Sequence, residues 1–197
     1  MSKKSVIISA IILVIITVVG YFYFDMTNNK WGVKPVIKSD SGGMYRNDKF
    51  GFEIKQPQGW TVDESGKLGT VVVFLNPVAD YDQSQSFFAN INFLTRPIKN
   101  LGVNNLEEYV ALDKSILLKY KQDAKFYPDE KVSINGKEGL IVNLTFMQNN
   151  MLMRDRHLIT INNNDVAYVL ATTALDSKWS EYTNLFESIL SSFRFTK

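Results

Sequence analysis

The sequence predicts an α+β fold in which helices pack on an antiparallel sheet, preceded by one N-terminal transmembrane helix. Three observations predict it: an uncharged, mostly apolar run at 5–24, a series of strand-like segments joined by short turns, and two amphipathic helical segments. We therefore divide the 197-residue chain into a cytoplasmic tip and membrane anchor at 1–24, a flexible linker at 25–44 and one folded domain at 45–197.

Composition limits the functions open to this domain. Apolar residues make up 45% of the chain and charged residues 21%, as in ordinary globular proteins. There is no cysteine, which excludes disulfides, thiol catalysis and cysteine-ligated metals. Once Lys3 and Lys4 are set aside, the remaining 20 basic residues balance the 20 acidic ones. Because nucleic-acid-binding proteins usually carry a marked basic excess, we expect no nucleic acid partner.

The run at 5–24 has the length of a membrane anchor. Twenty helical residues rise about 30 Å, which matches the hydrocarbon thickness of a bilayer. A cleaved signal peptide is the alternative, but its apolar core is typically only about 7–15 residues long. Lys4 before the run and Asp25 after it favour a cytoplasmic amino end, whereas three linker lysines weigh against it. We expect a single-pass cell-membrane protein that contacts the lipid bilayer through residues 5–24, with its domain on the extracytoplasmic side.

Asn, Lys, Ser and Gly dominate the segment at 25–44, and no apolar period extends through it. This composition predicts a flexible linker. Trp31 and Val36 leave open the alternative that part of the linker packs on the domain.

Alternating apolar residues predict the first strands of the domain. Phe50, Phe52 and Ile54 alternate with other residues and predict a strand that ends by Pro57. The β-branched run at 71–75 predicts a central strand. Alternation at 87–93 predicts a third strand that stops before Pro97.

After Pro128 the sequence predicts an antiparallel meander with short turns. Asn135-Gly136 is its clearest hairpin signal, because both central positions of a type I′ turn need positive φ. The four predicted strands are 132–134, 139–146, 151–161 and 166–174.

Two amphipathic segments predict helices that cover the sheet. The first begins at an N-cap, Asn105, with Glu108 in the capping position. Its predicted apolar stripe is Leu106, Tyr109, Val110, Ile116, Leu117 and Tyr120. Its predicted polar face is Glu107, Asp113, Lys114 and Lys121. The second helix starts near Asp176, and we interpret its apolar stripe as a core face. That stripe is Trp179, Tyr182, Phe186, Ile189, Leu190 and Phe193.

The single histidine, His157, limits the possible active sites. Any Ser-His-Asp relay would have to include it, and no G-x-S-x-G motif is present. Asp155 lies two residues earlier on the same strand face, a spacing that could serve a metal or an acid–base pair. Met153 and Ile159 share that face, which favours a buried, hydrogen-bonded structural role. We predict no catalytic residue and no cofactor, and retain Asp155 and His157 as candidate metal ligands.

Other motifs are incomplete. Asp80 and Asp82 resemble the start of a calcium loop, but Gln85 replaces the required glycine and Ile91 the terminal glutamate. We therefore expect a solvated loop. No phosphate-binding glycine motif occurs, and the glycosylation sequon at Asn143 lies in a predicted strand.

The two ends of the domain resemble the PsbP family, which is named for the extrinsic luminal subunit of photosystem II. The opening stretch carries a recurring pattern of Tyr45, Gly51, Phe52, Pro57, Gly59 and Trp60. The closing helix ends in the Ser-Phe-Arg pattern of Ser192, Phe193 and Arg194. The resemblance implies an α-β-α sandwich with a central antiparallel sheet and a mostly non-catalytic accessory role at a membrane complex. It transfers no binding residue to this chain.

These observations lead to one main functional hypothesis and two alternatives. The main hypothesis is a membrane-tethered, non-enzymatic accessory or binding subunit of a membrane complex, with an unidentified membrane protein as its partner. The first alternative is a small-ligand or metal-binding module. The second is a hydrolase whose site the sequence does not reveal.

Overall fold

A computed structural model describes residues 43–196. The predicted anchor at 1–24 and residues 25–42 of the predicted linker lie outside the described residues. The first strand, β1 (Met44–Asn47), begins one residue before the expected domain boundary. None of the helices in the described part of the chain is both long and apolar enough to cross a membrane.

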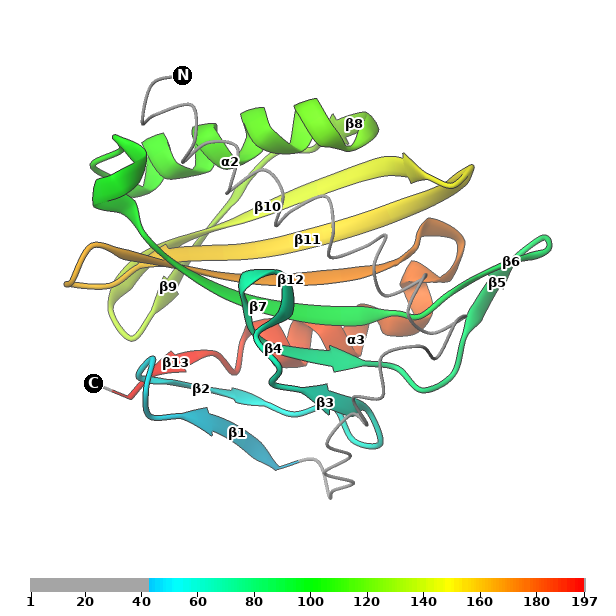
Figure 1. The fold of residues 1–197 in the computed structure, drawn as a ribbon, viewed down its shortest axis with the longest axis horizontal. Helices are drawn as coiled ribbons and strands as arrows, with labels where there is room; N and C mark the ends of the chain where they lie inside the picture. The colour runs from blue at the N-terminus through cyan, green and yellow to red at the C-terminus, as the bar shows by residue number, and fades with distance from the viewer. Residues whose placement is uncertain (1–42, 197) are drawn as a thin grey trace.

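An eight-stranded antiparallel sheet forms the centre of the domain (Figure 1). Its strands are β3 (Thr61–Asp63), β4 (Thr70–Leu75), β7 (Asn90–Pro97), β8 (Gln122–Phe126), β9 (Glu130–Ile134), β10 (Lys137–Gln148), β11 (Met151–Ile161) and β12 (Val166–Leu175). They follow the order β3-β4-β7-β12-β11-β10-β8, and β9 pairs with β10 beside β8. The long strands β10, β11 and β12 are the meander that the short turns predict.

Two small sheets and two α-helices complete the described fold. One small sheet is β1, β2 (Phe52–Lys55) and β13 (Arg194–Phe195); the other is a hairpin of β5 (Asp80–Asp82) and β6 (Gln85–Phe87). The helices are α2 (Leu106–Tyr120) and α3 (Trp179–Leu190). Three 3-10 turns are η1 (Lys67–Gly69), η2 (Ile98–Leu101) and η3 (Asp176–Lys178).

The helices lie on opposite faces of the central sheet, which gives the α-β-α layering that the resemblance implies (Figure 1). Alternate residues of β12 pack on opposite faces of the sheet: Val169 joins the hydrophobic cluster under α2, and Leu170 joins the hydrophobic cluster under α3. Phe186 and Ile189 of α3 join the cluster that also holds Phe52 of the small sheet. The α+β class is therefore confirmed, and the C-terminal stripe is a core face.

The predicted helix N-cap and the predicted hairpin turn are both confirmed. The Asn105 side chain accepts a hydrogen bond from the Glu108 N–H at 2.8 Å, as an N-cap should. Asn135 and Gly136 both have positive φ, 50° and 78°, and connect β9 to β10.

Of two predictions about the first half of the domain, one is confirmed and one is wrong. The run at 71–75 lies in β4, which pairs with β3 on one side and with β7 on the other, so it is a strand in the interior of the sheet, as predicted. Its continuous apolar sequence reflects burial on both faces. Asp80 and Asp82 lie in the β5–β6 hairpin instead of a solvated loop, and the Tyr182 hydroxyl donates to Asp80 at 2.7 Å.

The predicted polar face of the first helix is also wrong at two positions. Asp113 and Lys121 face the sheet, with side chains only 13% and 11% exposed. Leu106, Val110, Asp113 and Leu117 follow the i, i+4, i+7, i+11 row of one helix face. The helical spacing alone places Asp113 on the buried face, although a charged side chain usually lies on the polar one.

Candidate functional site

Asp155 and His157 lie side by side on the face of β11 that α2 covers. Their side chains are within hydrogen-bonding distance, with His157 Nε2 3.2 Å from Asp155 Oδ2. Both residues are buried, at 2% and 7% exposure. Met153 and Ile159 on the same face are buried as well.

The two misassigned residues of the first helix region complete a four-residue ion cluster. Lys121, the C-cap of α2, donates from Nζ to Asp155 Oδ2 at 2.8 Å and lies over the Phe146 ring at 3.4 Å. Asp113 Oδ2 lies 3.7 Å from His157 Nδ1, an ion pair slightly longer than a hydrogen bond. We call Asp113, Lys121, Asp155 and His157 the buried cluster. It joins the C-terminal half of α2 to β11.

The charges of the buried cluster stabilise one another. Burial alone would lower the pKa of His157, but the carboxylates of Asp113 and Asp155 raise it to about 9. Burial alone would raise the pKa of Asp155, but Lys121 and His157 hold it well below its usual value. At neutral pH the cluster therefore holds two carboxylates, one ammonium and one imidazolium, with no net charge.

A cavity of about 80 Å³ borders the buried cluster. Four buried atoms that line it have no hydrogen-bond partner within the described residues: Asn92 Oδ1, Asp113 Oδ2, Asp155 Oδ1 and His157 Nδ1. One water needs roughly 10–15 Å³ of such a cavity, so a few waters fit and would supply hydrogen bonds to these four atoms.

The geometry of the buried cluster does not suit a metal or a general base. Residues 43–196 contain no group of three or more His, Asp or Glu side chains arranged to hold a metal ion. Lys121 already neutralises Asp155, so a metal ion would have to displace an ammonium group. His157, held as the imidazolium, has no lone pair for proton abstraction near neutral pH. The cluster is best described as a structural ion network.

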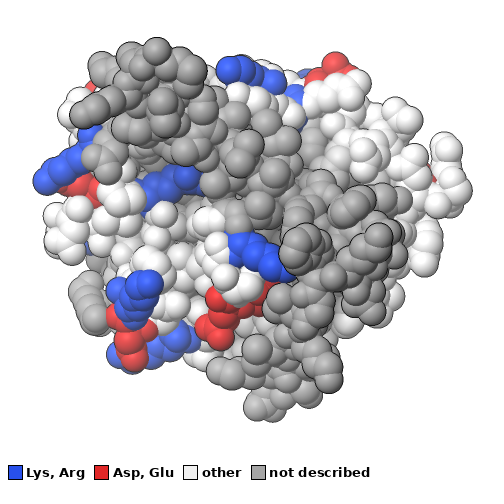
Figure 2. Space-filling model, viewed as in Figure 1, with Lys and Arg blue, Asp and Glu red and all other residues white. Residues whose placement is uncertain are grey.

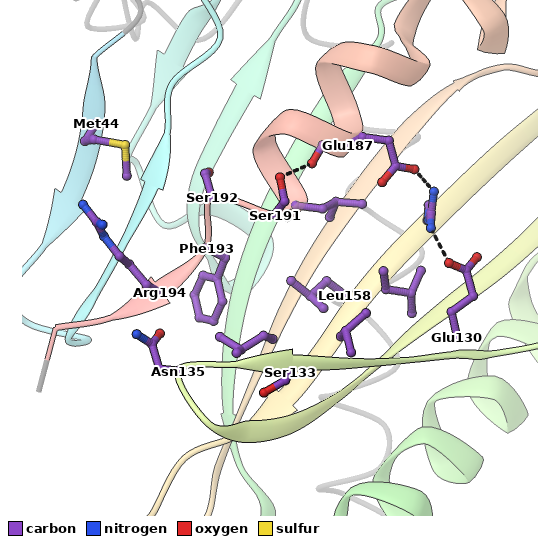
Figure 3. Close-up of a pocket in the computed structure, with 15 residues that line it drawn as sticks. Met44, Glu130, Ser133, Asn135, Leu158, Glu187, Ser191, Ser192, Phe193 and Arg194 are labelled. Atoms are coloured by element: carbon purple, nitrogen blue, oxygen red, sulfur yellow. Dashed lines mark hydrogen bonds and ion pairs between the residues drawn. The ribbon is translucent and has the colours of Figure 1, made fainter.

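A much larger groove opens on the other face of the sheet (Figure 3). It has a volume of about 720 Å³ and lies between the β9–β10 hairpin and the segment that leads from α3 into β13. Its apolar side chains are Val132, Ile134, Ile141, Leu158, Leu190 and Phe193. Small polar residues line its rim: Ser133, Asn135, Ser191 and Ser192. We call this feature the groove.

One arginine crosses the groove wall between two glutamates. Arg156 forms ion pairs with Glu130 at 2.7 Å and with Glu187, which approach it from opposite sides in Figure 3. Both glutamates remain about half exposed. The three side chains together carry one net negative charge at neutral pH.

The edge of β9 beside the groove is unpaired. In a hairpin with a two-residue turn, Ile134 and Lys137 form a hydrogen-bonded pair and the pattern then alternates. The backbone N–H and C=O groups of Lys131 and Ser133 therefore point away from β10. Within residues 43–196, β10 is the only strand that pairs with β9. Asn135 closes one end of the groove, because its side chain accepts from the Phe195 N–H at 3.1 Å.

The sequence revealed none of these groove residues as a site. They come from β1, β9, β10, β11, α3 and β13, so no local motif contains them. One signal was present: the Asn-Gly hairpin implies a strand at 132–134, and only the pairing order shows that this strand lies at an edge.

The described surface carries no large patch of one charge in the view of Figure 2, where basic and acidic side chains lie next to one another. This distribution agrees with the balanced charge of the domain.

Comparison with known proteins identifies the family. The family model of PsbP matches residues 43–195, nearly all of the described domain. The chain belongs to the PsbP family. The resemblance at Tyr45–Trp60 and Ser192–Arg194 is thus confirmed by a match that spans both ends. A search of curated proteins found no match.

Solved structures share the fold of this PsbP-family chain at low sequence identity. Cyanobacterial PsbP from Synechocystis sp. PCC 6803 is 16% identical over 84% of this chain and 98% of its own, with a TM-score of 0.57. The Ran-binding protein Mog1p of Saccharomyces cerevisiae is 11% identical over 80% and 96%, with a TM-score of 0.54. LpqN of Mycobacterium tuberculosis, described as involved in cell envelope biogenesis, is 14% identical over 83% and 90%, with a TM-score of 0.53. These likenesses establish the fold.

Proposed function

We propose that this PsbP-family chain is a non-enzymatic accessory or binding subunit of a membrane complex. Residues 5–24 tether it to the cell membrane, the domain lies on the extracytoplasmic side, and a partner membrane protein binds in the groove. The observation that carries the proposal is the groove itself, an open apolar cleft beside an unpaired strand edge.

The chemistry of the groove suits a polypeptide partner. Apolar side chains along its floor and small polar groups at its rim are the usual composition of a binding cleft. The outward N–H and C=O groups of Lys131 and Ser133 can pair with an extended partner segment, a recognition mode that supplies affinity through the main chain. The description of Mog1p as Ran-binding gives one example of a binding protein with this fold.

The buried cluster supports the non-enzymatic part of the proposal. Its ionisable groups already neutralise one another, and its cavity of about 80 Å³ is too small for most substrates. Small-ligand binding remains a second candidate, because the groove volume of about 720 Å³ falls within the roughly 300–1,000 Å³ of typical ligand pockets.

Site-specific photo-crosslinking in intact cells tests the partner. A photoreactive amino acid replaces Ser133 at the groove rim, and a matched variant carries it at Ser115, an exposed position on α2 across the sheet. We expect a discrete adduct of higher mass from position 133 and none from 115. Equal adducts from both positions, or none from either, would overturn the groove as the partner site.

Membrane extraction and protease access test the tether. The intact chain should stay in the membrane fraction through carbonate washing, and deletion of 5–24 should release it. Protease added to spheroplasts should digest the domain. If the domain resists protease until the cells are lysed, the proposed orientation is reversed.

A further inference from the structure

The groove-facing side of β9 has an apolar end and an acidic end. Alternate residues of a strand point to opposite faces of the sheet, so Glu130, Val132 and Ile134 share one face. All three line the groove, and Ile134 belongs to the hydrophobic cluster under α3. The side chains of Lys131 and Ser133 point to the other face of the sheet. The groove therefore meets β9 along one acidic and two apolar side chains.

The acidic end keeps a negative charge that no cation of the groove offsets. Arg156 lies between Glu130 and Glu187 and neutralises only one of the two carboxylates (Figure 3). Asn143 donates from Nδ2 to Glu130 Oε1 at 2.9 Å, which helps to orient this carboxylate without adding charge. Both glutamates remain about half exposed, so a further cation can reach them from the groove.

The other cations close to the groove already have partners. Arg194, which lines the groove, pairs with Glu53. Lys55 donates from Nζ to Ser188 Oγ at 2.9 Å, outside the residues that line the groove. The net negative charge at the acidic end is therefore available to a partner.

The free edge of β9 determines which residues of an added strand face the groove. Within residues 43–196, Lys131 and Ser133 turn their N–H and C=O groups away from β10 and pair with no other strand. In an antiparallel added strand, one residue lies opposite each of them and exchanges both hydrogen bonds with it. The residues opposite Glu130, Val132 and Ile134 then form non-hydrogen-bonded pairs, in which the side chains lie closest. All strand pairs between residues 43 and 196 are antiparallel, which favours this direction.

We propose that the partner supplies an extended antiparallel strand whose groove-facing residues are apolar, apolar and basic, in that order from its amino end and at alternate positions. The apolar side chains lie over Ile134 and Val132, and the Lys or Arg side chain reaches Glu130 and Glu187. This inference rests on the proposed function and adds the chemistry of the partner segment. The apolar pair and the main chain supply affinity, and the basic residue supplies selectivity.

A second copy of this chain does not fit the same pattern. If two β9 strands paired antiparallel with Val132 opposite Val132, Glu130 of one copy would lie opposite Ile134 of the other. That arrangement brings a carboxylate to the apolar end and no cation to the acidic end. A different protein with the stated pattern is therefore the better occupant.

Peptide binding to the full chain in detergent micelles tests the pattern. The probe is a fluorescently labelled peptide with blocked ends, Ser-Val-Thr-Ile-Thr-Lys-Ser, and the matched control replaces its Lys by Glu. At about 50 mM NaCl, fluorescence anisotropy should show that the lysine peptide binds about three- to tenfold more tightly. At about 500 mM NaCl the preference should shrink, because salt screens exposed charges. Equal affinities at low salt, tighter binding of the glutamate peptide, or no binding of either peptide would each overturn the proposal.

Two charge-neutralising variants locate the preference. Glu130→Gln should reduce the ratio of the two affinities to less than about twofold. Glu138→Gln, whose parent residue pairs with Lys131 on the other face at 3.1 Å, should leave the ratio unchanged. Ser133→Pro should weaken both peptides by a similar factor, because it removes an outward N–H. If Glu130→Gln keeps the full preference, the cation does not bind at the acidic end, and the proposal is wrong.

This inference and the proposed function fail separately. A photo-crosslink from position 133 together with equal peptide affinities would overturn the stated pattern and leave the groove as the partner site. A lysine preference that Glu130→Gln abolishes, without any photo-crosslink in cells, would support the pattern and overturn the proposed partner.

Discussion

Strand β11 sends alternate side chains into two regions that differ in almost every physical respect. Asp155 and His157 enter the buried cluster under α2, whereas Arg156 and Leu158 enter the groove on the other face. The cluster borders about 80 Å³ and its ion-paired charges are nearly all removed from solvent. The groove holds about 720 Å³ and its glutamates stay half exposed.

The comparison shows why charged residues alone do not locate a functional site. The cluster has the more reactive composition, yet its groups neutralise one another and have little access to solvent. The groove has ordinary side chains, but it offers unpaired backbone groups and an accessible apolar floor. Changes in the cluster should therefore affect folding, and changes in the groove should affect binding.

The largest expected effect is loss of stability on removing the central carboxylate of the cluster. Asp155→Ala leaves Lys121 and His157 buried without their shared partner, and breaking a buried ion pair in this way typically costs about 3–5 kcal/mol. At about 2–4 °C per kcal/mol for a domain of this size, the melting temperature should fall by roughly 6–20 °C. Thermal melts of the parent, Asp155→Ala and Asp82→Ala measure it. The Asp82 variant, in the partly exposed β5–β6 hairpin, should melt near the parent.

If Asp155→Ala melts like the parent, water reaches the cluster freely, and the assignment of a structural role to the buried cluster is incorrect.

The second effect is a dependence of the free energy of unfolding on pH, caused by the titration of His157. Its pKa is raised from 6.5 to about 9 in the folded state, so its contribution is complete below about pH 6.5 and is lost as the pH rises through about 9. At about 1.4 kcal/mol per pKa unit, the loss is on the order of 3 kcal/mol. Urea unfolding of the parent from pH 6 to 10 should show this decline. His157→Gln, which cannot titrate, should remove most of that decline; an unchanged pH profile would assign it to another group.

The third effect contrasts two neighbouring residues of β9. Ser133→Pro removes an N–H that points away from β10, so it should cost about 1 kcal/mol or less. Val132→Pro removes a hydrogen bond of the β9–β10 ladder and leaves the Gly139 C=O without its partner, so it should cost about 1–3 kcal/mol. Equilibrium unfolding of both variants measures the difference. Equal destabilisation would show that the outer edge of β9 is not free.

The smallest effect is expected for the exposed charges of the groove. Glu130→Gln weakens an ion pair with Arg156 in which the glutamate is half exposed, and such pairs contribute about 0–1 kcal/mol. Its melting temperature should stay within a few degrees of the parent. A drop as large as that of Asp155→Ala would show that this ion pair stabilises the fold as strongly as the buried cluster does.

The sequence predicted those parts of the fold that depend on local signals. The N-cap at Asn105, the hairpin at Asn135-Gly136 and the apolar stripe of α3 each follow from residues within a few positions of one another. Short strands such as β3 and β8 were missed, because three to five residues of mixed polarity carry too little periodicity.

The candidate site depended on information that no local pattern contains. Asp113 and Lys121 enter the core only because Asp155 and His157 on a distant strand compensate their charge. The groove depends on which strand lies at the sheet edge, and long-range pairing decides that. The spacing of Asp155 and His157 did predict that they share a face, since a strand alternates strictly with period two.

The assignment of binding to the groove and of stability to the buried cluster is tested most directly by amide hydrogen exchange. The full chain is measured in native membranes and compared with the chain purified in detergent. If the groove is the binding region, residues 130–135 and 191–195 should gain protection in membranes, and residues 109–121 and 153–159 should exchange equally in both samples. Protection gained under α2, with none at the groove, would show that partners act on the buried cluster and would contradict the account.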